Sequence, residues 1–219
     1  IQQGALPEKV RIIPHGIDLT LFERKMSDGE ANKFKQRFSI PSDKHIVSFV
    51  GRLSRENYVY DIIEAARLLL NRRNDFVVFM AGEGNEEKDL NKLVDSNEEL
   101  KTHVILSGFL SHEDVIKLRI VSNVNLVLMG GFSLIEACAS GKPVVAYNVE
   151  WHSELVKDGE TGYLVSERDI ARLVAVIDKL LLNSEESRRL GENARRLVSE
   201  RHSLEVTSAI KRSCYQELL

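Results

Sequence analysis

Short runs of apolar, largely β-branched residues alternate along the chain with longer stretches in which apolar residues recur at helical spacing. This alternation is typical of β-α units wound into a parallel sheet. Runs such as IVSFV and FVVFM are almost continuously apolar, which indicates strands covered on both faces. The pattern therefore predicts an α/β fold with helices on both faces of the sheet. The predicted strands are residues 10–13, 45–50, 76–80, 103–106, 124–129, 143–147 and 163–165, and the predicted helices between them are residues 31–38, 58–72, 86–94, 112–121 and a short helix that begins at Ser133.

After residue 165 the pattern changes to helix only, with amphipathic helices predicted over residues 168–182, 185–200 and 204–219. The middle helix is rich in arginine, which is typical of a solvated face. No internal repeat or proline-rich linker divides the chain. We therefore predict one domain over residues 1–202. Residues 203–219 then form a C-terminal helix that packs on this domain or reaches toward another one.

Composition and charge narrow the class of protein. The chain is 43% hydrophobic and 29% charged, with 30 basic and 33 acidic residues, as in ordinary globular proteins. A net charge of -3 gives no electrostatic reason to expect a nucleic-acid partner. Cys138 and Cys214 lie far apart without metal-ligand spacing, which favours reduced thiols and a cytoplasmic location.

The first residues of the sequence and its apolar runs indicate whether the chain carries a targeting segment or a membrane span. No apolar run is long enough to cross a membrane. The first ten residues, IQQGALPEKV, contain no initiator methionine and neither the basic start nor the apolar run of a signal peptide. We interpret the sequence as a piece of a longer chain.

Candidate chemistry is expected at the carboxyl ends of the strands, where open parallel sheets bind ligands. Four segments there carry glycine or charge: GRLSREN from Gly51, AGEG from Ala81, SGF from Ser107 and GGFSLIEACASG from Gly130. In the last one, two glycines precede the start of a helix. Free backbone N–H groups and the positive end of the helix dipole suit a phosphate there.

Each candidate residue also has a structural interpretation. Ser133 and Glu136 form the S-x-x-E pattern of a helix-capping box, so Glu136 is either a cap or a ligand residue. Arg52 follows a strand directly and suits a pyrophosphate, but a surface arginine or a pair with Glu56 is the alternative. The AGEG segment is a weak signal, and Glu83 in it could simply be exposed in a turn.

Six segments, taken together and in order, carry a resemblance to a known family: PHGID, FVGRLSREN, AGEGN, LSGFLSHEDV, GGFSLIEACASGKPVVAYN and DGETGYLV. They closely resemble the donor-binding C-terminal domain of retaining glycosyltransferases of the GT-B fold, family GT4. The resemblance covers about residues 10–165, and the helical tail is similar to the family's usual ending. It implies a Rossmann-like domain that faces an acceptor-binding N-terminal domain across a cleft. This sequence resembles the second domain alone, so we expect the fragment by itself to be inactive.

The resemblance implies roles for two charged residues. Arg52 occupies the position of an arginine that contacts the donor phosphates. The family's usual lysine, as in GRLSREKG, is replaced by Asn57, so Arg55 or another cation would have to supply that charge. Glu136 matches the second glutamate of E-G-F-G-x-x-x-x-E, which binds the ribose hydroxyls. Gly130 stands where the first glutamate would contact the sugar.

The remaining implied contacts are mostly with the backbone. The N–H groups of Ser133 and Leu134 are candidates for the pyrophosphate, and Gly108 and Phe109 are candidates for the nucleobase, although Phe109 could equally be a core residue. Glu154 resembles the glutamate of the family's G-x-x-E segment. Trp151 either stacks on a ligand or a partner domain or is buried in the core, and His152 receives no role. The implied catalytic residues are Arg52 and Glu136, and the implied donor-binding residues are Gly51, Arg52, Gly108, Phe109, Gly131, Ser133, Leu134 and Glu136.

The implied reaction transfers a glycosyl unit from a nucleotide diphosphate sugar of the UDP, GDP or ADP type to an acceptor hydroxyl with retention. The resemblance implies neither a metal nor a separate cofactor, and the acceptor would be bound by the N-terminal domain. Two alternatives stay open. One is a non-catalytic nucleotide-binding or interaction module, and the other is a GT-B relative such as a nucleotide-sugar epimerase or a phosphorylase.

Overall fold

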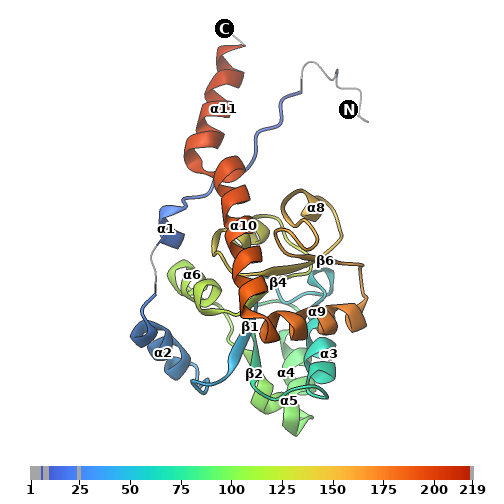
Figure 1. Ribbon diagram of the computed structural model, residues 1–219. Coiled ribbons are helices and arrows are strands. Elements are labelled where there is room, and N and C mark those ends of the chain that lie inside the picture. The colour runs from blue at the N-terminus through green and yellow to red at the C-terminus, as the bar shows by residue number, and fades with distance from the viewer. Residues whose placement is uncertain (1–5, 7–9, 24–25, 218–219) are drawn as a thin grey trace.

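A parallel sheet forms the centre of the molecule (Figure 1). The computed structural model describes residue 6 and residues 10–23 and 26–217. In this part of the chain the sheet has six strands in the order β3-β2-β1-β4-β5-β6, all paired in parallel. The strands are β1 (His45–Val50), β2 (Phe76–Ala81), β3 (Val104–Leu106), β4 (Val124–Val127), β5 (Val144–Tyr147) and β6 (Tyr163–Val165). The predicted fold is therefore confirmed, and six of the seven predicted strands are present.

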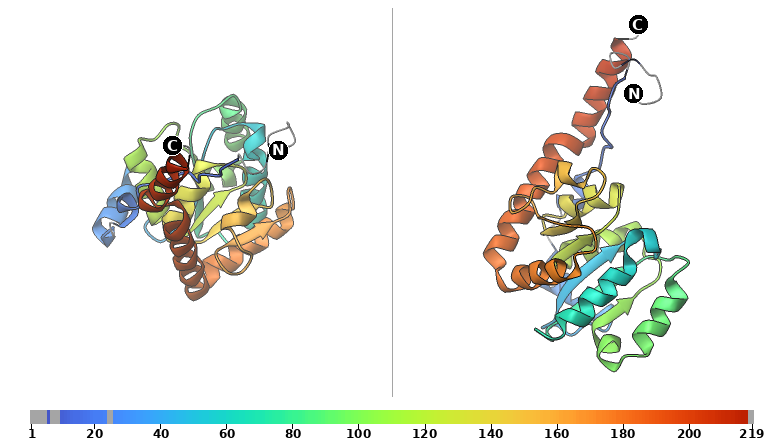
Figure 2. Two further views of the ribbon diagram at one scale, coloured as in Figure 1. Left: turned by 90° about the horizontal axis from the view of Figure 1, so that it is seen from above. Right: turned by 90° about the vertical axis from the view of Figure 1, so that its right-hand side faces the viewer.

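The predicted strand over residues 10–13 is wrong. Its side chains are exposed, to 39% for Val10, 86% for Ile12 and 42% for Ile13. Figure 2 shows this segment running away from the sheet beside the C-terminal helix. β-Branched residues favour a strand only where a neighbouring strand supplies hydrogen bonds and packing, and none of the described strands pairs with this segment.

Helices cover both faces of the sheet. One face packs against α3 (Val59–Leu69), α4 (Glu87–Asp95), α5 (Glu98–His103) and α9 (Ile170–Leu182). The other face packs against α2 (Asp28–Arg37), α6 (His112–Val121), α7 (Phe132–Ala139) and α10 (Ser184–His202). In β1, the side chains of Val47 and Phe49 pack in the core on the α3 face of the sheet, and that of Ile46 packs in the core on the α2 face. This alternation is expected because successive side chains of a strand point to opposite faces.

Four short elements do not appear among the predicted ones: α1 (Thr20–Glu23), the 3₁₀ helix η2 (Arg55–Asn57), α5 and α8 (His152–Leu155). Three of them have four residues or fewer, which is too short to show helical periodicity. α5 begins where the side chain of Asn97 accepts hydrogen bonds from the N–H groups of Glu99 and Leu100, both at 3.0 Å. The predicted long helices are present within a few residues of their expected bounds.

The C-terminal helix stands apart from the rest. α10 ends at His202, Ser203 caps the next helix, and α11 (Leu204–Gln216) projects away from the sheet beside residues 10–15 (Figure 2). A hydrogen bond of 2.9 Å joins His202 Nδ1 to the carbonyl of His15. Thr207 is the one buried residue of this helix. None of the described helices is long and apolar enough to span a bilayer.

Strand order fixes where a ligand site can form. β1 and β4 are neighbours in the sheet, but the chain leaves β1 toward α3 on one face and leaves β4 toward α7 on the other. The order of strands reverses between them. Such a switch point opens a crevice at the carboxyl ends of the two strands.

Candidate functional site

The first side of the crevice is the loop after β1, and it is built on a close approach to the loop after β2. The N–H of Leu53 donates to the carbonyl of Glu83 at 2.9 Å, and the N–H of Glu86 donates to the carbonyl of Leu53 at 3.0 Å. A Cβ on Gly82 would lie 2.0 Å from the carbonyl oxygen of Gly51, and Gly82 also has φ +138°. The AGEG segment therefore needs glycine in order to hold the β1 loop.

Arg52 stands exposed at the start of this loop. Within the described part of the chain, no carboxylate lies within ion-pair distance of its guanidinium, so the alternative pair with Glu56 does not form. Arg55, the other candidate cation, is engaged: its Nε lies 3.3 Å from Oε1 of Glu86, and its guanidinium lies 5.1 Å from the centre of the Tyr60 ring. The cation available at the carboxyl end of β1 is therefore Arg52.

Asn57 and Tyr58 shape the end of the loop. The Asn57 amide donates to the carbonyl of Arg52 at 2.7 Å, which closes the loop instead of adding charge. Tyr58 matches the glycine of GRLSREKG and has φ +54°, so the chain keeps a left-handed residue there at a cost of about 1–2 kcal/mol. Its ring packs edge-on against Tyr147, and burial together with the Glu167 carboxylate raises the pKa of Tyr58 to about 12.

The second side of the crevice is the start of α7, and the predicted capping box is wrong there. α7 begins at Phe132 with Gly131 as N-cap, and no side chain caps it. Ser133 lies inside the first turn, where its hydroxyl donates to the carbonyl of Val50 at 2.9 Å and ties α7 to β1. The two glycines allow the helix to begin earlier than the S-x-x-E pattern suggests. The same pattern forms a true capping box at Ser27 and Glu30, which begins α2.

The backbone donors of α7 differ from the expected pair. The N–H of Leu134 already donates to the carbonyl of Gly131 at 3.1 Å, so Leu134 has no free backbone donor for the pyrophosphate. Among the residues that the structure describes, the N–H groups of Phe132 and Ser133 have no acceptor. The positive end of the helix dipole and two free donors therefore face the crevice here.

Glu136 is held by two basic side chains of α6. Its side chain is buried, with Oε1 2.8 Å from His112 Nε2 and Oε2 3.6 Å from Arg119 Nε. Burial lowers the pKa of Arg119, and the Glu136 carboxylate opposes that shift. Sequence reasoning missed both partners. Their spacing of about two helical turns places His112 and Arg119 on one face of α6, and this spacing could have pointed to them in the sequence.

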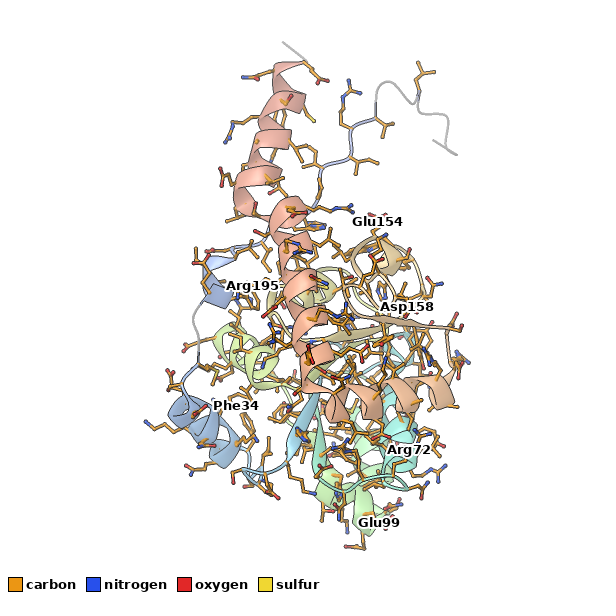
Figure 3. All side chains as sticks on the ribbon, viewed as in Figure 1. Phe34, Arg72, Glu99, Glu154, Asp158 and Arg195 are labelled. Atoms are coloured by element: carbon orange, nitrogen blue, oxygen red, sulfur yellow. The ribbon has the colours of Figure 1, made fainter. Side chains whose placement is uncertain are left out.

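His152 received no role from the sequence, but the structure gives it one. It is fully buried, with Nε2 3.0 Å from the carbonyl oxygen of Gly130 and Nδ1 3.0 Å from that of Tyr147. It thus joins the loop after β4 to the end of β5. Trp151 is half-buried and contacts His152 edge-on, whereas Glu154 is exposed on α8 toward the α11 end of the molecule (Figure 3).

The loop after β3 supplies the third part of the crevice. Gly108 has φ +68°, and its carbonyl accepts from the N–H of Gly82 at 2.9 Å. Phe109 is 75% exposed, so its interpretation as a core residue is wrong. The structure leaves an aromatic ring in solvent one turn before His112. No group of three or more potential metal ligands comes together among the described residues.

Comparison with known proteins identifies the family. The model of the family described as glycosyl transferases group 1 matches residues 30–197, and this chain belongs to that family. The alpha-D-kanosaminyltransferase of Streptomyces kanamyceticus is 30% identical over 202 residues, which cover 89% of this chain and 51% of that protein. The chain thus spans about half the length of that relative.

Two solved structures have the same fold. Anabaena HepE in complex with UDP-glucose gives a TM-score of 0.82 at 22% identity, covering 99% of this chain and 59% of that one. The C-terminal domain of the group 1 glycosyl transferase LpcC from Francisella tularensis gives 0.74 at 23% identity, covering 86% of this chain and 100% of that one. The Rossmann-like fold expected from the resemblance is therefore confirmed.

Proposed function

We propose that this chain is the donor-binding domain of a retaining glycosyltransferase of family GT4. One observation carries the proposal: an exposed arginine without an ion pair among the described residues follows β1, and an uncapped helix start follows β4 on the other side of the switch point, with a buried carboxylate one turn inside the helix. Arg52 supplies the cation, Phe132 and Ser133 supply the free N–H groups, and Glu136 supplies the carboxylate.

The diphosphate of the donor would lie between Arg52 and the start of α7. A planar guanidinium suits phosphate oxygens, and free N–H groups at the positive end of a helix add directed donors. As the glycosidic bond breaks, negative charge grows on the departing diphosphate, and fixed donors stabilise that charge without reorganisation. Gly51 and Gly131 would let the backbone approach the phosphates closely on each side.

The ribose would bind Glu136. A carboxylate offers about four acceptor positions, so Glu136 can keep its contact with His112 and still accept two hydroxyls. The nucleobase would lie near Gly108 and Phe109, where a turn with φ +68° exposes backbone groups beside an aromatic ring in solvent. Because HepE was solved with UDP-glucose, UDP sugars come first among the UDP, GDP and ADP types.

The acceptor would be recognised by a second domain. In support, large apolar side chains are exposed on α11 and the segment beside it, to 86% for Ile12, 50% for Leu204 and 59% for Tyr215, and another domain could cover them. The relative from Streptomyces is about twice as long as its matched part. We therefore expect this chain alone to bind donor but not to transfer sugar.

The two cysteines are free, which supports a reducing, cytoplasmic location.

Calorimetric titration with UDP, GDP and ADP tests the proposal. We expect one of them to bind the chain, and we expect Glu136→Ala to weaken that binding by about tenfold or more, because it removes hydrogen bonds to a charged group. Binding of none of the three would contradict the proposal and favour the interaction module. Mass-spectrometric analysis of nucleotide-sugar products from the longer protein then separates glycosyl transfer from epimerisation.

A further inference from the structure

Arg119 is the one described residue whose buried side chain keeps polar atoms without a hydrogen-bond partner. Its exposed fraction is 0%, and Nε and Nη1 make no hydrogen bond within the described residues. Its Nη2 donates to Ser133 Oγ at 2.6 Å, and its Nε lies 3.6 Å from Glu136 Oε2. The guanidinium therefore contacts both α7 residues that face the proposed donor.

A buried and incompletely paired arginine destabilises the folded state relative to an apolar residue of similar size. Removing a guanidinium from water costs free energy that incomplete pairing does not recover, and apolar replacements of buried ion pairs are often as stable or more stable. Its neighbours on α6 that face inward, Ile116 and Leu118, are apolar. Packing alone therefore gives no reason for a cation at this position.

The contacts of Arg119 explain what the cation does. A carboxylate that is to accept two ribose hydroxyls must be held in one orientation, and a charge beside one of its oxygens leaves the other directions for the ligand. His112 contacts Oε1 from the exposed side, and Arg119 lies beside Oε2 from the core side. Cys138 is the other titratable group that faces Arg119.

We infer that Arg119 is a positioning residue for ribose recognition: its charge holds the Glu136 carboxylate in the orientation that receives the 2′ and 3′ hydroxyls. This inference rests on the proposed function. Arg119 itself touches no ligand atom. Its second contact, through Ser133 to the carbonyl of Val50, keeps α7 against β1 while Glu136 is aimed.

A matched pair of variants separates charge from packing. Arg119→Gln removes the charge and can still donate to Ser133, whereas Arg119→Lys keeps a charge beside Glu136. For each variant and the wild type, calorimetry gives the affinity for UDP and for 2′,3′-dideoxyuridine diphosphate, and their ratio measures ribose recognition. The dideoxy ligand also serves as a folding control, because it uses the same phosphate contacts.

We expect the wild type to prefer UDP by about tenfold or more, since each hydrogen bond to a charged group contributes a substantial part of that factor. In Arg119→Gln the ratio should fall to about twofold, while affinity for the dideoxy ligand stays within about twofold of wild type; in Arg119→Lys most of the ratio should return. Glu136→Gln should resemble Arg119→Gln.

The outcomes separate the two proposals. If the wild type binds UDP and Arg119→Gln keeps the full ratio, Arg119 does not position Glu136 and this inference is overturned alone. Equal loss of both ligands in the Gln and Lys variants would also overturn it, since that pattern indicates a structural role. If the wild type binds neither UDP, GDP nor ADP, the proposed function falls and this inference falls with it.

Discussion

The two sides of the crevice are built in different ways. The loop after β1, residues 51–58, is held by backbone hydrogen bonds to the neighbouring loop and by the Asn57 amide, and its cation Arg52 is exposed and unpaired within the described structure. The start of α7 is held by the buried polar side chains of Arg119 and His152 and by the half-buried Ser133.

On the first side, mutations should change ligand binding without changing the stability of the fold. On the second side, they should change both. An exposed side chain such as Arg52, which makes no ion pair or hydrogen bond through its guanidinium among the described residues, can be removed with little effect on the fold. His152 is buried and lies between two backbone carbonyls, so truncating it should disturb both the core and the start of α7. The two sides should therefore respond differently to mutation.

The largest effect is expected at His152. His152→Ala removes the imidazole that lies between the carbonyls of Gly130 and Tyr147 and opens a cavity, which should lower the free energy of unfolding by about 3 kcal/mol. Urea denaturation followed by circular dichroism measures this change. Glu154→Ala on the same helix is the matched control, and it should stay within about 0.5 kcal/mol of wild type because its side chain is exposed. Equal stabilities of the two variants would show that the second side does not depend on buried polar contacts.

Arg52→Ala should give the opposite result, a change in binding without a change in stability. We expect UDP to bind about 10–100-fold more weakly and uridine to be unaffected, because the lost hydrogen bonds go to the phosphates. Arg55→Ala is the control, since Arg55 is already engaged with Glu86 and Tyr60. An equal loss of UDP and uridine affinity would contradict a phosphate role for Arg52.

The fold could be predicted because its signal is repeated along the chain. Each long helix and each buried strand carries its own periodicity, and the order of the elements then gives the parallel sheet. Residues 10–13 show the limit: a β-branched run predicts a strand, but only the fold decides whether a neighbouring strand is present. The helices α1 and α8 are too short to show any period.

The sequence proposes site residues only where a single segment carries a motif. Arg52 and Glu136 are such proposals, and both lie near glycine-rich turns at the carboxyl ends of strands. His152 could not be assigned, because its partners are backbone carbonyls that β4 and β5 bring together and that no side-chain pattern records. The capping interpretation of Ser133 failed because α7 already begins at Phe132, so Ser133 lies inside the first turn, and its hydroxyl donates to the carbonyl of Val50, which is distant in sequence.

A smaller effect should follow from restoring the family's cation on the first side. Asn57→Lys places a positive charge beside Arg52 and should tighten UDP binding by about fivefold at low salt, less at high salt because the site is exposed. Asn57→Ala is the control for the lost hydrogen bond to the Arg52 carbonyl. If both variants weaken UDP binding equally, loop closure by Asn57 matters more than the missing charge.

The smallest effect concerns the far end of α7. Burial raises the pKa of the Cys138 thiol to about 12, so the reactive thiolate is nearly absent at pH 8. Because the folded-state pKa lies above the ordinary value of 9.0, this thiol favours the folded state fully below pH 9, and that contribution is lost as the pH rises toward 12. With a thiol-specific disulfide reagent at pH 8, the half-buried Cys214 should react in the native protein and both cysteines should react in denaturant. Cys214→Ser should then show almost no native reactivity. Rapid labelling of Cys138 in that variant would mean that α7 opens readily and that buried contacts do not hold the second side in place.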